Sequence, residues 1–267
     1  MINKDASNSN TLTKLGFSFE KGGAHCSRTI MLDELTQLFE FVPEIDVTKQ
    51  EYFKAITEEN CLSKRSGKTR ILTFRHLVDL YALDPSVVLF RTMRYFWQRD
   101  VDARPLIALL LAYARDSVLR SVTKIILCTP EGSVLTRETV EKAIDNIERG
   151  RFSEATLKST AQNINSSFTK SGHLAGKAKK IRTRPAPTAG SVSFALFLGY
   201  LCGSRGMEMF ETEFSKLLDC SFERMAELAE DASRKGWINC KRIGSVIEIV
   251  FPNLITQKEL DQLYEKN

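Results

Sequence analysis

The sequence predicts a mainly α-helical fold with short β-hairpins. Apolar residues recur at spacings of three and four through most of the 267 residues, which is the periodicity of amphipathic helices. Alternation typical of paired strands is confined to two stretches, near residues 174–184 and 237–251. Hydrophobic residues make up 43% and charged residues 27%, as in an ordinary globular chain of two or three domains.

The N-terminal half is expected to contain an arm and a helical domain. Residues 1–26 are rich in Asn, Ser, Thr and Gly, and we expect a loosely ordered arm there. Residues 27–128 form the predicted helical domain. Thr48 is placed to cap a helix, and Asp84 and Pro85 are placed to begin another. The expected helices cover 31–41, 48–60, 68–83, 85–99, a stretch from 102 or 103 to 115, and 116–127.

Residues 129–185 are predicted to form a winged helix-turn-helix. Thr136 and Ser153 are placed as N-caps of its two helices, and Gly150 and Gly172 are placed to end them. A hairpin whose loop contains a glycine follows the second helix and supplies the wing. The expected turn, helices and hairpin cover 129–133, 136–149, 154–171 and 174–184.

Residues 186–267 are predicted to form a second winged-helix module, joined through a Pro- and Gly-containing linker at 185–190. Its third helix carries more acidic than basic residues, so we expect it to pack internally or to hold a protein partner. Lys241 and Arg242 on its wing leave room for a minor DNA contact. The expected helices and strands cover 191–202, 207–218, 222–235, 237–242 and 245–251.

Composition and motifs argue against several functional classes. Six separated cysteines without a C-x-x-C pair, and three scattered histidines, predict reduced thiols and no metal site. The apolar run Pro105–Ala114 has about half the length that a membrane span needs, and the polar start lacks a secretory signal. Phosphate-loop, dinucleotide-binding and nucleophile-elbow motifs are missing. We therefore expect a cytoplasmic protein without cofactor or catalytic residues, and not an enzyme.

The main functional signal is a stretch without acidic residues, from Ala155 through Met207. Ordinary surfaces mix both signs of charge, whereas a run of one sign creates the positive potential that a polyphosphate requires. The net charge of the whole chain is only +5, so the distribution matters more than the total. The cations of this stretch are Lys158, Lys170, Lys177, Lys179, Lys180, Arg182, Arg184 and Arg205.

The helix over 154–171 divides into two faces. Its apolar face carries Leu157, Ala161, Ile164 and Phe168 at spacings of four, three and four, and is expected to face the core. The opposite face carries amides, hydroxyls and lysines, which hydrogen-bond base edges and phosphates. We expect these residues in or near a DNA groove: Lys158, Gln162, Asn165, Ser166 and Lys170. We expect these wing residues on the DNA backbone: Lys177, Lys179, Lys180, Arg182 and Arg184.

A second basic patch precedes and begins the helix over 68–83, where no acidic residue occurs between Glu59 and Asp79. Helix N-termini bind phosphate, so this patch is a candidate extension of the DNA footprint. The alternative is a polar loop between core helices. The candidate contacts are Lys64, Arg65, Lys68 and Arg70.

The runs Ala55–Ser66, Phe152–Lys158 and Phe168–Leu174 resemble the BrxA proteins of BREX phage-exclusion systems, over about residues 30–185. The resemblance implies an all-helical DNA-binding accessory protein of bacteriophage defence. It also implies that the protein acts together with a methyltransferase, an ATPase and an alkaline-phosphatase-like partner. The DNA-contacting role would fall on the helix over 153–171. The C-terminal module at 191–251 is longer than the corresponding part expected for that family.

The leading hypothesis is therefore a double-stranded DNA-binding accessory protein of a BREX-like system. The second is a non-catalytic scaffold or protein-interaction subunit of a defence or regulatory complex. An RNA binder ranks third, because the basic stretch offers no exposed aromatic for base stacking. A hydrolase ranks last.

Overall fold

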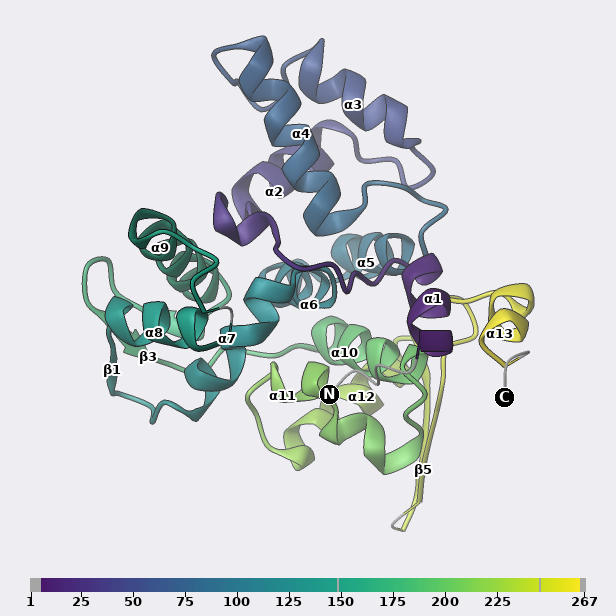
Figure 1. The fold of residues 1–267 in the computed structure, drawn as a ribbon. Coiled ribbons are helices and arrows are strands. Elements are labelled where there is room, and N and C mark those ends of the chain that lie inside the picture. The colour runs from purple at the N-terminus through teal and green to yellow at the C-terminus, as the bar shows by residue number, and fades with distance from the viewer. Residues whose placement is uncertain (1–5, 148, 245, 265–267) are drawn as a thin grey trace.

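Helices dominate the structure, and two small antiparallel sheets complete it (Figure 1). The computed structural model describes residues 6–147, 149–244 and 246–264. The mainly α-helical fold predicted from the apolar periodicity is confirmed. No helix in these three ranges combines the length and apolar composition needed to cross a membrane.

The centre of the fold consists of α5 (Val88–Arg99), α6 (Arg104–Arg115) and α10 (Ala189–Leu201), which contact one another pairwise. Every residue from Leu106 to Ala114 is buried. A helix that is apolar on all sides is stable only when other elements surround it. The two halves of the chain therefore share one hydrophobic core.

Of the first four helices, α2, α3 and α4 lie above this centre in Figure 1, and α1 lies apart from them at its right. Thr48 caps α3 as predicted, because its hydroxyl accepts the Glu51 N–H while the Glu51 carboxylate accepts the Thr48 N–H. Helix α5 begins later than Pro85, since the Asp84 carboxylate first closes a turn by accepting from the Ser86 N–H. The four helices are α1 (Ala6–Leu15), α2 (Leu32–Phe41), α3 (Lys49–Thr57) and α4 (Gly67–Tyr81).

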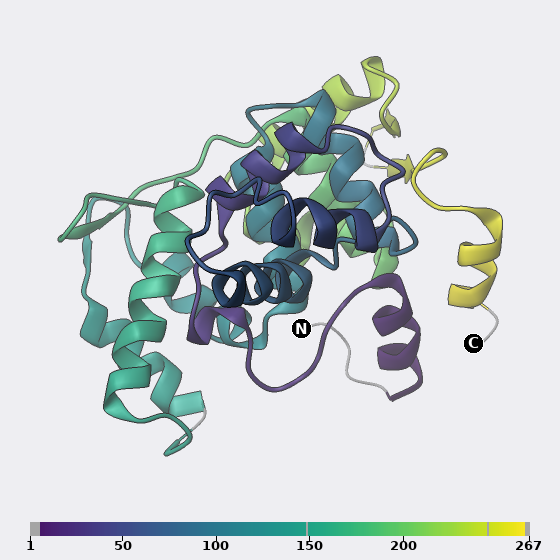
Figure 2. The ribbon, with the colours of Figure 1, turned by 90° about the horizontal axis from the view of Figure 1, so that it is seen from above.

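The middle of the chain forms a lobe at one side of the molecule (Figures 1 and 2). Strand β3 lies between β1 and β2 and runs antiparallel to both. Strand β1 is absent from the predicted elements because two residues are too few for an alternating pattern. In chain order the lobe contains α7 (Ser117–Cys128), β1 (Val134–Leu135), α8 (Arg137–Ile147), α9 (Glu154–Lys170), β2 (Leu174–Ala175) and β3 (Lys180–Arg182).

The C-terminal part packs through α10, carries a projecting hairpin and ends in a short helix (Figure 1). The single helix predicted over 207–218 is divided, because Thr212 caps a new helix by accepting the Ser215 N–H. Arg91 on α5 ties the last helix to the core through an ion pair with Glu259 at 2.9 Å. After α10 come a 3₁₀ helix (Gly206–Glu211), α11 (Glu213–Lys216), α12 (Phe222–Arg234), β4 (Asn239–Ile243), β5 (Val246–Val250) and α13 (Gln257–Tyr264).

Two segments predicted to be loose are folded. The expected arm over residues 1–26 is wrong from Ala6 onward: Leu12 is fully buried and Phe17 is 2% exposed. Residues 1–5 lie outside the described residues. The predicted linker at 185–190 is fixed as well, since the Gly190 N–H donates to the Asp100 carboxylate at 2.8 Å. In both segments a few long-range contacts outweigh a polar or flexible composition.

A buried hydrogen-bond chain connects the N-terminal segment, α7 and α9. His25 Nδ1 lies 2.9 Å from Asp116 Oδ2, and His25 Nε2 lies 2.9 Å from Ser167 Oγ. None of the three residues is more than 2% exposed. Asp116 also caps α7 by accepting the Val118 and Leu119 N–H groups. This chain fixes the position of α9 against the central helices.

We expect Asp116→Asn to lower the free energy of unfolding by about 3 kcal/mol at neutral pH, because it removes the charged partner of a buried histidine. Burial acts to raise the pKa of Asp116, but His25 and the backbone donors lower it below the ordinary 3.8. The carboxylate's contribution is therefore complete above that ordinary value and is lost as the pH falls through the lowered pKa. Urea denaturation at several pH values measures the effect.

The control is Asp102→Asn, which changes an exposed carboxylate and should alter stability by less than about 0.5 kcal/mol. A loss at Asp116→Asn as small as that of the control would contradict the structural role of the carboxylate.

Candidate nucleic-acid interface

Helix α9 is anchored by one face and presents the other outward. The Ser153 hydroxyl accepts the Thr156 N–H and so caps the first turn, as predicted. Ala161, Ile164 and Phe168 are fully buried, which agrees with the predicted apolar face. Their burial against α8 and the core leaves the polar side of α9 to form the wall of a groove.

The groove beside α9 brings together residues that are distant in the sequence. It has a volume of about 750 Å³ and lies between β1, the first turn of α8, α9 and the loop that joins β2 to β3. The predicted DNA-contacting residues that line it are Gln162, Asn165, Ser166, Lys177, Lys179 and Lys180.

The wing loop turns tightly and so places its lysines at the groove. Gly176 has a φ of +93°, and a Cβ there would lie 2.2 Å from the Lys179 carbonyl oxygen, so only glycine fits. Lys177 and Lys179 are exposed. Lys180 bends back, and its Nζ donates to the Gly176 carbonyl at 2.7 Å. Partial burial lowers the pKa of Lys180.

Asn165 lies in the wall of the groove, but its side-chain oxygen is buried. The residue is 5% exposed, and its Oδ1 has no hydrogen-bond partner among the described residues. Because this oxygen is buried from solvent, a molecule in the groove does not reach it, and the predicted contact of Asn165 with DNA is not available in this conformation. Gln162 is exposed three residues earlier on the same helix and extends this polar wall.

Carboxylates are present at the rim but leave the lysines unmasked. Glu138 lines the groove and lies 2.9 Å from Arg137, which also lies 2.7 Å from Glu141. Both carboxylates form ion pairs with Arg137 and not with the wing. The positive charges of Lys177 and Lys179 are therefore available to a ligand. The electrostatic balance of the groove is therefore positive.

Arg182 is a correction to the predicted set. It is 3% exposed, and its Nη2 lies 2.6 Å from Asp219 Oδ2 in the C-terminal part. Its Nε donates to the Ile126 carbonyl at 2.9 Å. The prediction that Arg182 contacts the DNA backbone is wrong, because these partners occupy the guanidinium inside the protein. Arg182 instead holds the wing against α7 and the C-terminal module.

The other predicted cations of the lobe have different surroundings. Lys158 is exposed on the first half of α9. Arg184 is 61% exposed and pairs with the equally accessible Glu131 at 3.1 Å. Lys170, near the other end of α9, pairs with Asp33 at 2.6 Å. Exposed ion pairs contribute about 1 kcal/mol or less, so a phosphate can replace the partner of Arg184 or Lys170.

The second basic patch is divided between structural and exposed cations and lies outside the groove. Lys64 pairs with Glu34 at 3.1 Å. Arg70 donates to the Thr57 carbonyl at 3.0 Å and thereby closes the connection between α3 and α4. Arg70 therefore fits the alternative that this segment is a polar loop between core helices, and not a contact with phosphate. The exposed members are Arg65 and Lys68.

The buried chain of His25, Asp116 and Ser167 has the residue types of a catalytic triad, and the sequence analysis did not detect it. The Ser167 hydroxyl donates to the Asn163 carbonyl and accepts the Ile30 N–H, both at 2.9 Å. Because the hydroxyl is fully buried and its bonds are occupied, it has no access to a substrate. No local motif could reveal the chain, since its members are more than 50 residues apart.

Metal-binding side chains are not clustered in the part of the chain that the structure describes: no three of its His, Cys, Asp or Glu residues are placed to hold an ion. The six cysteines carry free thiols. Burial raises the pKa of the Cys202 thiol to about 12 and that of Cys220 to about 11, so these two are protonated and unreactive near neutral pH.

We expect protonation of His173 to destabilise the junction between the wing and the C-terminal module, because it places a positive charge in a buried site beside Arg182. The Nε2 of His173 donates to the Leu217 carbonyl at 2.8 Å, and burial lowers the pKa of His173 to about 4. The unfolded state therefore takes up a proton first, and stability falls as the pH drops from 6.5 toward 4, by on the order of 3 kcal/mol. Unfolding measured across this range should show the loss, and His173→Gln should lack it. An identical pH dependence in both proteins would contradict the assignment.

No family model and no curated protein matches this chain. The resemblance to the BrxA proteins, which rests on the runs at 55–66, 152–158 and 168–174, stays a prediction. The groove beside α9 is the structural basis from which a function can be inferred.

Proposed function

We propose that this protein is a non-enzymatic accessory protein that binds duplex DNA through the groove beside α9, in a BREX-like phage-defence system. One observation carries the proposal: two amides, a hydroxyl and three lysines from separate parts of the chain line a single groove. Amides and hydroxyls recognise base edges, and lysines bind phosphates. The resemblance to BrxA proteins supports the assignment to phage defence.

The order of elements in the lobe supports a winged helix-turn-helix. A helix, a short strand, two helices and two strands follow one another, and β3 lies between β1 and β2. In helix-turn-helix proteins the second helix of the motif lies in the major groove. By this correspondence α9 is the recognition helix, and the loop between β2 and β3 is the wing that contacts the backbone.

We expect the triple charge reversal Lys158→Glu, Lys177→Glu and Lys179→Glu to weaken binding to duplex DNA at least a hundredfold, with little dependence on base sequence. The three lysines are exposed, so the change removes phosphate contacts without altering the core. In the wild type, Arg184 adds a fourth exposed cation, so log K should fall with log salt at a slope of about −4. Fluorescence anisotropy at several salt concentrations gives both quantities.

The matched control reverses three exposed lysines outside the groove: Lys142→Glu, Lys216→Glu and Lys258→Glu. It changes the net charge equally and should retain most of the affinity and the salt slope. Equal loss in both triple variants would mean that only the overall charge attracts DNA and would contradict a defined interface at α9.

The scaffold hypothesis is favoured by a different surface. The hairpin of β4 and β5 projects from the body (Figure 1), and its tip exposes Ile243 by 81% and Val246 by 68%. Exposed apolar side chains at such a tip are typical of protein contacts. A partner bound there would leave the DNA groove accessible.

We expect Ile243→Ser with Val246→Ser to leave DNA affinity unchanged, because the two residues lie outside the groove. If a partner subunit of the defence system binds the hairpin, co-purification with that subunit after nuclease treatment should fall. Unchanged recovery of the subunit would contradict this role of the hairpin, while a drop in DNA affinity would place the tip in the DNA footprint.

A further inference from the structure

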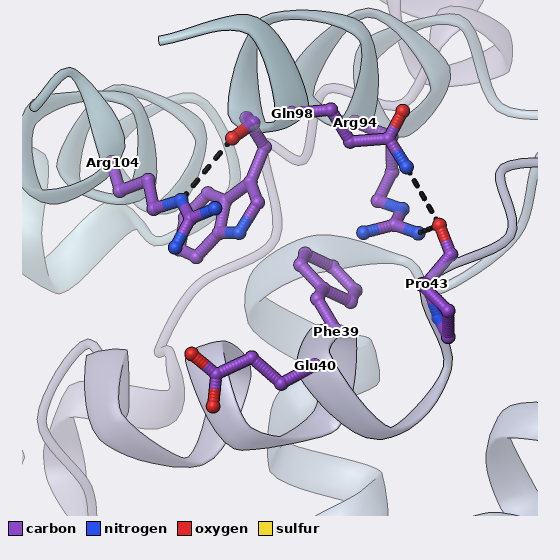
Figure 3. Close-up of a pocket in the computed structure, with 7 residues that line it drawn as sticks. Phe39, Glu40, Pro43, Arg94, Gln98 and Arg104 are labelled. Carbon is purple, nitrogen blue, oxygen red and sulfur yellow. Dashed lines mark hydrogen bonds between the residues drawn. The ribbon is translucent and has the colours of Figure 1, made fainter. Parts of the chain in front are cut away.

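A small pocket between α2, α5 and α6 is satisfied by contacts within the protein (Figure 3). Arg94 is 1% exposed, and its Nη2 donates to three backbone carbonyls, the nearest of which is that of Glu44 at 2.7 Å. The carboxylates of Glu40 and Glu44 together offset the charges of the two arginines that line the pocket. The surface that is open to another molecule lies on the hairpin of β4 and β5, where Ile243 and Val246 are the most exposed large apolar side chains of the described residues.

The hairpin projects from the body, with one face toward the protein and one toward solvent (Figure 1). Ile247 and Ile249 of β5 are buried, so their side of the strands faces the protein. Because side chains alternate along a strand and directly opposite residues share a face, the other side of the hairpin is its outward face. The outward face consists of three exposed cross-strand pairs: Ile243 with Val246, Lys241 with Glu248, and Asn239 with Val250.

The edges of the hairpin are less open than its outward face. At one edge the Cys240 N–H donates to the Ser233 hydroxyl of α12 at 3.1 Å. At the other edge the chain comes so close to β5 that a Cβ on Gly206 would lie 3.2 Å from the Ile247 carbonyl oxygen. A strand that extended the sheet would have to displace these segments. A protein partner therefore packs on the outward face.

The outward face carries one positive and one negative charge at its centre, with apolar side chains on either side of them. Neither Lys241 nor Glu248 forms an ion pair with another described residue. A wholly apolar partner would bury both charges without counter-charges, which is unfavourable. A phosphate backbone would be repelled by Glu248. The partner that fits has apolar residues beside two charges of opposite sign, and a second copy of the same face has this order.

Two copies of the outward face are complementary when they pack about a twofold axis parallel to the strands. This rotation lays β4 of each copy over β5 of the other and forms an isologous interface. Each Lys241 then faces the Glu248 of the second copy, and each Ile243 faces the Val246 of the second copy. Two pairs of opposite charge and two apolar contacts form together, and no like charges are opposed.

We propose that the protein forms a symmetric dimer through the outward faces of two hairpins. The inference rests on the proposed role of the hairpin in protein contacts and identifies the partner as a second copy of this chain. The groove beside α9 takes no part in the contact, since none of its lining residues belongs to the hairpin. Three residue pairs per copy bury less than the roughly 1,200 Å² of a stable complex, so the dimer is reversible and forms at high protein concentration.

Sedimentation velocity over a series of protein concentrations measures the association of the wild type and of two single variants. Lys241→Glu and Glu248→Lys each oppose like charges in the dimer, so each should raise the dissociation constant at least about tenfold. An equimolar mixture of the two variants should associate nearly as the wild type does, because a dimer with one copy of each again opposes unlike charges. Repulsion inside each hairpin persists in the mixture, so this recovery reports contact between copies.

The matched control makes the same two charge reversals at the end of α3, at the exposed Lys54 and Glu58. Lys54→Glu, Glu58→Lys and their mixture should all associate like the wild type, which separates the outward face from the general effect of charge. Circular dichroism verifies that every variant is folded.

A wild type that stays monomeric at its highest soluble concentration, or a mixture no more associated than its two components, would overturn the proposal. In that case, loss of the defence subunit from the Ile243→Ser and Val246→Ser variant would assign the outward face to that subunit. The charge-reversal test at α9 uses other residues, so the dimer and the DNA interface can each fail alone.

Discussion

The enclosed Asp116 carboxylate joins the N-terminal segment to the start of α7 in the interior of the fold. It accepts hydrogen bonds from both the backbone N–H and Nδ1 of His25, and from the first two N–H groups of α7. The approach of the chain is so close that a Cβ at Gly23 would lie 2.0 Å from Asp116 Oδ1. Through His25 the same network reaches Ser167 on α9. A bond to the N-terminal segment therefore contributes, together with packing against α8, to the position of the candidate recognition helix.

The basic residues of the lobe consequently serve two different purposes. Arg182 points inward and joins the wing to the C-terminal part through Asp219, while His173 adds a second connection to the Leu217 carbonyl. With the base of the wing fixed from inside, Lys177 and Lys179 extend from its loop. A base held by buried contacts and a loop with exposed lysines suit a surface that binds a phosphate backbone.

Local sequence signals predicted most of the helices and several of their caps, because these depend on residues within one turn of each other, but they did not predict α1 or α13. Ser153 and Thr48 are examples of correctly predicted caps. Contacts between distant segments could not be predicted in this way. The alternation in β3 places Lys180 and Arg182 on one face, but only the pairing of Arg182 with buried Leu174 shows that the Arg182 side chain is turned inward. The groove itself likewise depends on how the wing folds toward α9.

Hydrogen–deuterium exchange with and without duplex DNA tests the central claim most directly, because it locates the contact along the chain. We predict slower exchange in the loop between β2 and β3 and in the part of α9 that lines the groove, around residues 162–166, with little change in α12. Protection confined to other helices, or none at a saturating DNA concentration, would contradict the claim.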